Sequence, residues 1–252
     1  LEALFANPRV NDIDWHRKFV YCGTGAAPAS LALYQKCRSY DFNFYEGYGM
    51  SETCAMAVST PGGRPKVGSV GVPYIDMECR VVDDDGNDVP LGERGELWLR
   101  GATVMKEYWN NPEETAKAFT EDGWLKTGDV VYMDEEGYIF IVDRTKDMII
   151  AGGYNIYPRD VDEVLMQHPA VADAMAVGVP DEYRGETVKA FVQLKPGQSV
   201  TFEELDAFCR QKLAPYKVPK LWEFRSELPR SATGKALRRI LRDEEIAKQK
   251  TE

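Results

Sequence analysis

Cysteine pairs and histidines are scarce in this sequence, and their scarcity argues against several classes of chemistry. The five cysteines are scattered and none forms a C-x-x-C pair, which argues against a disulfide framework and a zinc site. The only histidines are His16 and His168, and His168 precedes a proline, where we expect it to end a helix. A Ser-His-Asp or Cys-His hydrolase is therefore disfavoured. Reduced thiols indicate a cytoplasmic protein whose chemistry comes mostly from other groups.

A surplus of positive charge and a long apolar run are also missing. The formal net charge is −10 at pH 7, which argues against nonspecific nucleic-acid binding because such binding depends on a cationic surface. No apolar run approaches the length of a membrane span, and the charged-then-apolar pattern of a signal peptide is absent from the first residues. We therefore expect neither a nucleic-acid partner nor a transmembrane segment.

The length and pattern of the chain predict a large domain followed by a smaller one. Its 252 residues exceed the usual size of one hydrophobic core. Residues 19–58 predict two strand–loop–helix units, "FVYCGTGAAPASLALYQKCR" and "FNFYEGYGMSETCAMAV". Residues 77–101 and 129–144 predict β-hairpins around the turn segments "DDDGND" and "DEEG".

The pattern changes near residues 144–147, where we place a domain boundary. Beyond it, "PRDVDEVLMQHP" predicts a helix, and "VADAMAVGV" and "TVKAFVQL" predict strands. Thr201 and Glu204 form a capping-box pattern at the start of another helix, and "LWEF" is a last strand before a basic terminal helix. The elements predict an α/β protein with residues 1–143 in the larger domain and 148–252 in the smaller one.

The hexapeptide "GYGMSE", residues 47–52, gathers groups that suit a nucleotide. Its glycines let a flat ligand approach the backbone, and Tyr48 offers a ring for that ligand to stack on. Ser51 offers a donor for phosphate, and Glu52 offers an oxygen ligand for Mg²⁺. A hairpin turn with an exposed glutamate explains the same residues without a function.

Two further polar segments lie at the ends of the second hairpin. Asp129 ends "GWLKTGD" just before a strand, where it suits either both hydroxyls of a ribose or an ordinary turn. Arg144 lies in "DRTKD", between two apolar strands, and Gly152 and Gly153 follow. Ordinary helix-start chemistry explains the next segment, "PRDVD", with its two aspartates. It does not explain "DRTKD" or the two glycines.

Lys235 follows a glycine in the polar segment "PRSATGKALRR", residues 229–239, and this order suggests a phosphate. It is not a P-loop lysine, because the Walker A pattern requires a glycine at Pro229 and a serine or threonine at Ala236. The structural alternative is a solvated lysine that opens the basic helix "KALRRILRDEEIAK".

Four segments together resemble the adenylate-forming superfamily in the order and approximate spacing of their motifs. This superfamily includes acyl-CoA synthetases, adenylation domains of peptide synthetases and firefly-type luciferases. The segments are "GYGMSE", "GELWLRGATVMKEYWNNPEETAKAF", "GWLKTGDVVYMDEEGYIFIVDRTKDMIIAGGYNIYP" and "PRSATGKALRR", and the resemblance extends over nearly everything from Gly23 to Arg239. "LAPYKVPK" and "SATGK" look most like the acyl-CoA synthetase branch.

The resemblance implies a nucleotide site with a role for each of these residues. Tyr48 would stack on adenine, Ser51 would contact the α-phosphate region, and Glu52 would ligate Mg²⁺. Asp129 and Arg144 would hold the ribose hydroxyls. The remaining implied residues are Gly25, Ala26, Ala27 and Pro28, which would border adenine, together with Glu46 and Gly47.

The resemblance also implies a two-step reaction. A carboxylate attacks the α-phosphate of ATP to give an acyl-adenylate, and the thiol of CoA then displaces AMP. Lys235 would bridge the substrate carboxylate and the α-phosphate, which suits a compact ammonium on a long stem. Lys146 falls at the hinge around which the small C-terminal domain rotates between the steps. The rotation would bring Gly152 and Gly153 to the pantetheine tunnel.

The resemblance covers the C-terminal half of such an enzyme. The loop that wraps the ATP phosphates in the family, "TSGTTGxPKG", has no counterpart here, so the missing N-terminal half is an expected partner. We expect part of the large AMP-binding N-domain, with mixed sheets and a β-barrel-like subdomain, and then a small α+β domain. The expected activity is ATP-dependent ligation of CoA to a fatty or aryl acid. The alternatives are a peptide-synthetase adenylation domain and a non-catalytic nucleotide-binding fragment.

Overall fold

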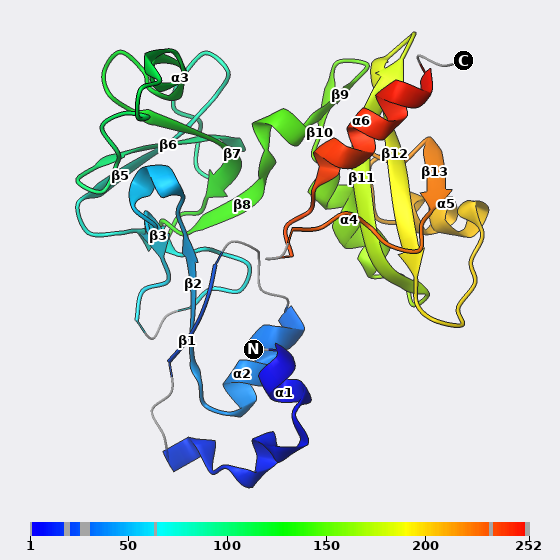
Figure 1. The fold of residues 1–252 in the computed structure, drawn as a ribbon, viewed down its shortest axis with the longest axis horizontal. Helices are drawn as coiled ribbons and strands as arrows, with labels where there is room; N and C mark the ends of the chain where they lie inside the picture. The colour runs from blue at the N-terminus through cyan, green and yellow to red at the C-terminus, as the bar shows by residue number, and fades with distance from the viewer. Residues whose placement is uncertain (1, 18–20, 26–30, 63–64, 232–233, 250–252) are drawn as a thin grey trace. The chain divides into compact units, whose positions relative to one another are not determined.

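The computed structural model describes residues 2–17, 21–25, 31–62, 65–231 and 234–249. The chain forms two compact units, Leu1–Ile141 and Val142–Glu252 (Figure 1). In the described residues helices accompany three separate sheets, which confirms the predicted α/β class. Within these ranges no helix combines the length and the apolar character needed to cross a bilayer.

The first sheet of the N-terminal unit begins with two parallel strands joined by a helix. Its elements are β1 (Tyr21–Thr24), α2 (Leu31–Ser39), β2 (Asn43–Tyr48), β3 (Val58–Ser59) and β4 (Val72–Pro73), and α1 (Glu2–Ala6) precedes them. Cys22 of β1 and Phe44 of β2 pack with Tyr34 and Cys37 of α2 in a small buried core. This arrangement confirms the strand and the helix of the first predicted strand–loop–helix unit, and residues 26–30 between them lie outside the described residues.

The second predicted strand–loop–helix unit is wrong, because the chain turns back after β2 instead of forming a helix. Ser51–Thr53 makes a single 3-10 turn, and Cys54 and Ala55 then take left-handed backbone angles, with φ of 50° and 89°. β3 follows and pairs antiparallel with β2. Gly49 permits this reversal, since a Cβ there would lie 1.6 Å from the Ala55 carbonyl oxygen. The tight loop leaves Glu52 close to the end of β2.

The next sheet contains both predicted hairpins. Its strands are β5 (Met77–Val82), β6 (Gly95–Gly101), β7 (Leu125–Met133) and β8 (Ile139–Arg144), in that spatial order, and α3 (Pro112–Ala118) lies between β6 and β7 in the chain. Leu97, Leu99, Val131 and Ile139 are fully buried in its core. In the described part of the chain, β5 and β8 are the edges of an open sheet, so the subdomain expected to be barrel-like is not a closed barrel.

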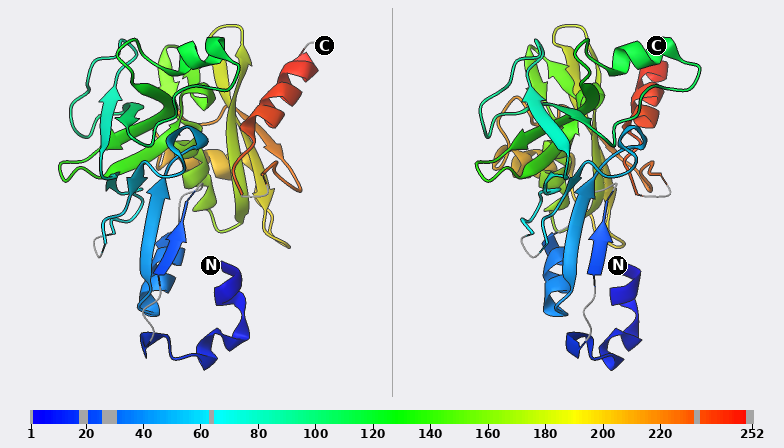
Figure 2. Two further views of the ribbon diagram at one scale, coloured as in Figure 1. Left: turned by 60° about the vertical axis from the view of Figure 1, so that its left-hand side comes forward. Right: turned by 90° about the vertical axis from the view of Figure 1, so that its left-hand side faces the viewer.

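The C-terminal unit is built around a sheet with helices on both faces. Its strands are β9 (Ile149–Ala151), β10 (Tyr154–Ile156), β11 (Val171–Asp181), β12 (Gly185–Leu194) and β13 (Leu221–Phe224), and its helices are α4 (Pro158–Met166), α5 (Phe202–Arg210) and α6 (Arg238–Gln249). β11 and β12 pair antiparallel, and β13 joins β12 in parallel. Ala174 and Ala176 of β11 face the core under α4 and α5, whereas Met175 and Val177 face the core under α6. Figure 2 shows α6, in red, on the opposite side of the sheet from α5.

Two of the local sequence signals in this unit are confirmed. The Thr201 hydroxyl accepts a hydrogen bond from the Glu204 N–H at 3.2 Å, and the Glu204 carboxylate accepts one from the Thr201 N–H at 2.8 Å, which completes the capping box. His168 lies just beyond the end of α4, as expected. The terminal helix begins at Arg238 and not at Lys235, because the residues before it form a loop.

A charge network ties α6 to the sheet. Lys189 of β12 is nearly buried, and its ammonium lies 2.8 Å from Glu223 of β13 and 2.6 Å from Glu245 of α6. Lys248 donates hydrogen bonds to both carboxylates. Burial opposes ionisation of Glu223, but the hydrogen bonds from Lys189 and Lys248 outweigh it and hold the pKa of this carboxyl at about 2. One buried cation between two carboxylates therefore fixes β13 and α6 to the same strand.

We predict that this network makes the C-terminal unit sensitive to acid. Because folding lowers the pKa of Glu223 from 4.5 to about 2, its stabilising effect is complete above pH 4.5 and is lost as the pH falls towards 2. In Glu223→Gln the slope of unfolding free energy against pH should decrease over this range, by at most about 1.4 kcal/mol per pH unit for one proton. Urea titrations followed by circular dichroism at several pH values measure the slope. Glu227→Gln, at an exposed position after β13, is the control, and an equal change in both variants would contradict the prediction.

Candidate functional site

A hydrogen bond joins Tyr48, at the end of β2, to Asp129 of β7. The Tyr48 hydroxyl donates to Asp129 Oδ2 at 2.5 Å, although the residues are 81 positions apart in the chain. Both are nearly buried, with 9% and 5% of their surfaces exposed. The Thr127 hydroxyl accepts from the Asp129 N–H at 3.1 Å and donates to the Leu97 carbonyl at 2.7 Å, which fixes this part of β7. The Tyr48 ring, predicted to stack on adenine, and the Asp129 carboxylate, predicted to bind ribose, are therefore adjacent.

The predicted border of adenine lies along β2 where the structure describes it. A Cβ at Gly25 would lie 3.3 Å from the Gly47 carbonyl oxygen, so the two backbones approach closely and glycine is favoured at position 25. Glu46 is buried, and its carbonyl accepts hydrogen bonds from the N–H and hydroxyl of Thr60 at 2.9 and 3.0 Å. Ala26, Ala27 and Pro28 lie outside the described residues.

Glu52 is held by a tyrosine that the sequence analysis missed. The Tyr108 hydroxyl donates to Glu52 Oε1 at 2.7 Å, and the Met105 N–H donates to the Glu52 carbonyl at 2.7 Å. The hydrogen bond to this carboxylate, together with burial, raises the pKa of Tyr108 to about 12, so the tyrosine stays a donor at neutral pH. The segment "MKEYWNNPEETA" contributed to the resemblance, but nothing in its spacing connected Tyr108 with Glu52.

The residues around Glu52 suit Mg²⁺ bound together with a phosphate substrate. In the described ranges no group of three or more His, Cys, Asp or Glu side chains is arranged to hold a metal ion. Mg²⁺ needs no such group, because it is commonly held by one or two carboxylates, substrate phosphates and water. Ser51 is exposed next to Glu52 in the 3-10 turn and is able to donate a hydrogen bond to the same phosphates.

The other predicted residues belong to the C-terminal unit. Arg144 ends β8 and is exposed, and Lys146 is exposed in the short turn that follows. Gly152 and Gly153 form the turn between β9 and β10, with φ of 60° and 83°, which favours glycine at both positions. Lys235 is exposed in the loop before α6.

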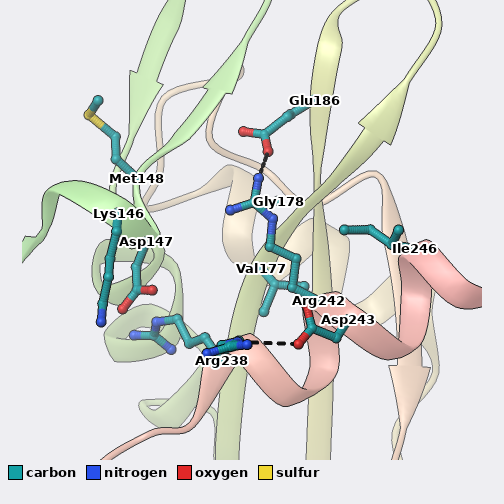
Figure 3. Close-up of a pocket in the computed structure, with 11 residues that line it drawn as sticks. Lys146, Asp147, Met148, Val177, Gly178, Glu186, Arg238, Arg242, Asp243 and Ile246 are labelled. Atoms are coloured by element: carbon teal, nitrogen blue, oxygen red, sulfur yellow. Dashed lines mark hydrogen bonds and ion pairs between the residues drawn. The ribbon is translucent and has the colours of Figure 1, made fainter.

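A cavity of about 360 Å³ in the C-terminal unit separates the Lys146 turn from α6 (Figure 3). Val177 and Gly178 of β11 line it, and Arg242 of α6 reaches across to Glu186, with Nη2 and Oε1 2.6 Å apart. The predicted hinge lysine therefore shares a cavity with the terminal helix, which no sequence pattern indicated. The other lining residues are Asp147, Met148, Arg238, Arg239, Asp243 and Ile246.

Arg238 and Asp162 form a buried ion pair at the edge of this cavity. Arg238 Nη1 lies 2.8 Å from Asp162 Oδ2, and their side chains are 11% and 8% exposed. Asp162 Oδ1 also accepts a hydrogen bond from the Ala176 N–H of β11 at 2.6 Å. Burial raises the pKa of Asp162 to about 7, although Arg238 acts to lower it. The interpretation of both aspartates in "PRDVD" as ordinary helix-start residues was therefore incomplete, because Asp162 connects three elements.

Two family models match the chain. The model for AMP-binding enzymes matches residues 2–109, and the model for the C-terminal domain of AMP-binding enzymes matches residues 160–235. The first match lies in the N-terminal unit and the second in the C-terminal unit.

Long-chain-fatty-acid–CoA ligases are among the curated relatives. The ligase of Bacillus subtilis (strain 168) is 50% identical over 227 residues, which are 89% of this chain and 40% of the relative. The ligase of Haemophilus influenzae (strain ATCC 51907 / DSM 11121 / KW20 / Rd) is 43% identical over 247 residues, which are 98% of this chain and 44% of the relative. The chain therefore spans less than half the length of these relatives.

Solved structures agree with these matches. ATP-bound MatB from Rhodopseudomonas palustris superimposes with a TM-score of 0.87 at 32% identity, over 96% of this chain and 48% of that one. The o-succinylbenzoate CoA synthetase (MenE) of Bacillus subtilis, in complex with the acyl-adenylate intermediate OSB-AMP, gives a TM-score of 0.79 at 38% identity, over 88% of this chain and 46% of that one. The family models, the relatives and the fold agree with the four motif segments, and the chain belongs to the AMP-binding enzymes, the adenylate-forming family.

Proposed function

We propose that this chain is part of an ATP-dependent carboxylate–CoA ligase, which joins a fatty or aryl acid to CoA through an acyl-adenylate. The observation that carries the proposal is the Tyr48–Asp129 pair, because an aromatic ring and a carboxylate that lie together at the end of β2 suit a nucleoside. The similarity to long-chain-fatty-acid–CoA ligases favours a fatty acid, and the similarity to o-succinylbenzoate CoA synthetase favours an aryl acid.

The adenosine of ATP would lie against the end of β2. The Tyr48 ring would stack on adenine, and Asp129, oriented by the Tyr48 hydroxyl, would accept hydrogen bonds from the ribose hydroxyls. Arg144 would contact the same ribose. Gly25 and Gly47 carry no side chain and would let the flat base approach the backbone. The remaining residues of this nucleotide site would be Ala26, Ala27, Pro28 and Glu46.

The phosphates would lie beside the turn that follows β2. Ser51 would donate to the α-phosphate region, and Glu52 would hold Mg²⁺, which neutralises phosphate charge when it is bound. Tyr108 would keep the Glu52 carboxylate in one orientation through its hydrogen bond. The loop "TSGTTGxPKG" of the family, which would enclose the outer phosphates, would come from the N-terminal half of the enzyme.

In the first step an oxygen of the substrate carboxylate attacks the α-phosphorus, and the bond from this phosphorus to pyrophosphate breaks. Two anions approach each other in this step, so a cation between them lowers the barrier. Lys235 would supply that cation, since its flexible stem lets the ammonium contact an oxygen of the substrate carboxylate and an oxygen of the α-phosphate.

In the second step the thiol of CoA attacks the acyl carbonyl and AMP leaves. The hinge at residues 144–147, with Lys146 at its centre, would let the domain of residues 148–252 rotate between the steps while residues 1–143 keep the nucleotide. Rotation would withdraw Lys235 and bring Gly152 and Gly153 towards the pantetheine arm. The partners would be ATP, CoA and a small carboxylic acid, in the cytoplasm.

A second candidate differs only in the acceptor thiol. A fatty acid–[acyl-carrier-protein] ligase, ScoC of Streptomyces coeruleorubidus, is 41% identical over 251 residues, which favours a carrier protein as an alternative to CoA. Parallel assays with CoA and with a phosphopantetheinylated carrier protein distinguish the two acceptors.

We predict that Lys235→Ala removes adenylation. The variant loses the cation between the two reacting anions, so acyl-adenylate formation should fall by at least about 100-fold. The full-length protein is incubated with ATP, Mg²⁺, CoA and a panel of short, medium, long and aromatic acids, and products are measured by mass spectrometry. Lys220→Ala removes an exposed lysine of the same unit and is the control. Unchanged adenylation in Lys235→Ala would refute the role of this lysine.

We also predict that Tyr48→Phe weakens AMP binding. The ring remains, but Asp129 loses the hydroxyl that orients it, so the dissociation constant should rise about tenfold, as for one hydrogen bond to a charged group. Asp129→Ala should weaken binding further. Isothermal titration with AMP measures both effects, and wild-type affinity in Asp129→Ala would contradict the proposed ribose contact.

A third prediction concerns metal dependence. Tyr108→Phe frees Glu52 Oε1 from its hydrogen bond, so the Mg²⁺ concentration for half-maximal adenylation should rise severalfold. AMP binding without Mg²⁺ should stay unchanged, because the Tyr108 hydroxyl contacts the carboxylate proposed for the metal and not the groups proposed for adenosine. If both quantities change together, Tyr108 acts on the fold and not on the metal site.

A further inference from the structure

The loop that carries Lys235 is closed by its own backbone. The Ser231 N–H donates to the Lys235 carbonyl at 2.9 Å, and the Gly234 N–H donates to the Ser231 carbonyl at 2.8 Å. The Ser231 hydroxyl accepts from the Lys235 N–H at 3.1 Å. Arg230 and Ala236 face each other as an isolated antiparallel bridge. These contacts fix the backbone of Lys235, while its side chain stays exposed.

Arg230 connects this loop to the sheet with all three guanidinium nitrogens. Its Nε and Nη2 donate to the two carboxylate oxygens of Asp173, at 2.7 and 2.6 Å, and its Nη1 donates to the Gly234 carbonyl at 2.9 Å. The Gly234 carbonyl belongs to the peptide that joins this residue to Lys235. The guanidinium of Arg230 therefore binds the Asp173 carboxylate of β11 on one side and the Gly234 carbonyl, next to Lys235, on the other.

Asp173 is itself held in place. It lies in β11 at an irregularity in the pairing with β12, between Val171 and Asp173, and its Oδ1 also accepts a hydrogen bond from the Ala174 N–H at 2.9 Å. Its side chain is 19% exposed, so the ion pair with Arg230 is only partly open to solvent. The contacts therefore run from Asp173 of β11, through the guanidinium of Arg230, to the peptide that precedes Lys235.

This arrangement has a consequence for catalysis. Gly234 has a φ of 82°, a left-handed conformation that favours glycine, and a glycine itself does little to restrict the backbone beside Lys235. The lysine side chain adds four rotatable bonds. Displacing a catalytic group by about 1 Å lowers the rate about 100-fold. The hydrogen bond from Arg230 to the Gly234 carbonyl, one residue before Lys235, is therefore expected to affect the rate.

From these contacts we infer that Arg230 and Asp173 are positioning residues that hold Lys235 for the adenylation step and take no part in thioester formation. The inference rests on the proposed function, in which Lys235 acts only in the first step. Neither residue touches a substrate in this role. A pair that only stabilises the fold would affect both steps alike, whereas a positioning pair affects adenylation alone.

The test measures the two half-reactions separately in the full-length protein. Adenylation is followed by pyrophosphate release from ATP and a fatty acid, and thioester formation is followed with a supplied acyl-adenylate and CoA. Arg230→Lys keeps the charge but loses the fork, so adenylation kcat should fall about 10- to 100-fold, with KM for ATP and acid unchanged. The thioester step should stay within about twofold of the wild type.

Two further variants separate positioning from stability. Arg100→Lys breaks a similar two-pronged pair with Glu78 in the N-terminal unit and should leave both half-reactions unchanged. The double variant Arg230→Asp/Asp173→Arg restores an ion pair but removes the donor to the Gly234 carbonyl. Its melting temperature should recover relative to the single variants while adenylation stays low.

The outcomes distinguish the possible failures. Wild-type adenylation in Arg230→Lys, or a parallel loss of both half-reactions, overturns the positioning role even if Lys235→Ala abolishes adenylation. Full adenylation in Lys235→Ala refutes the proposed function of the lysine, and the positioning role falls with it. Selective loss of adenylation in Arg230→Lys supports the inference, as does the same loss in Asp173→Asn, which removes the charge that Arg230 contacts.

Discussion

The long antiparallel pairing of β11 and β12 is the constraint on which the C-terminal unit depends. Successive side chains of a strand point to opposite faces, so the apolar run of β11 serves two cores, one under α4 and α5 and the other under α6. The polar side chains that bind other elements lie towards the two ends of the β11–β12 pair. Asp173, near the start of β11, holds Arg230, and Glu186, near the start of β12, holds Arg242 and the backbone of β9. Contacts with β11 and β12 therefore position both the Lys235 loop and the terminal helix α6.

Buried charges in this unit work as connectors between elements. Arg238 and Asp162 join α6 to α4, while Lys189 joins α6 and β13 to β12. A buried ion pair contributes little net stability, because desolvation offsets most of the attraction, yet the loss of one partner leaves an unpaired charge that is costly. Each pair thus penalises any arrangement in which α6 lies elsewhere. These ion pairs thereby hold in place α6, the helix that follows the loop carrying Lys235.

The N-terminal unit uses tyrosines to orient carboxylates. Tyr48 donates to Asp129, and Tyr108 donates to Glu52, so each carboxylate keeps one oxygen engaged and its rotation is restricted. A phenol suits this purpose because it remains protonated at neutral pH and is large enough to bridge segments that are distant in the chain. The carboxylates proposed for ribose and for Mg²⁺ are thereby oriented before any ligand arrives, which reduces the cost of ordering them on binding.

The sequence by itself determined the family, the α/β class and most strands and helices, because these depend on local patterns and on motifs that are contiguous in the chain. It also named the residues of the candidate site, whose roles stay predictions. It also determined the Thr201 capping box, whose partners are three residues apart. Only the tertiary structure decided the reversal after β2, the open edges of the β5–β8 sheet, and the pairing of Tyr108 with Glu52, Asp162 with Arg238 and Asp173 with Arg230. These contacts join residues separated by many positions, and a hydrogen bond or ion pair between two side chains leaves no periodic trace in a single sequence. The fold brings such residues together, and for that reason the partners of the site residues were visible only in three dimensions.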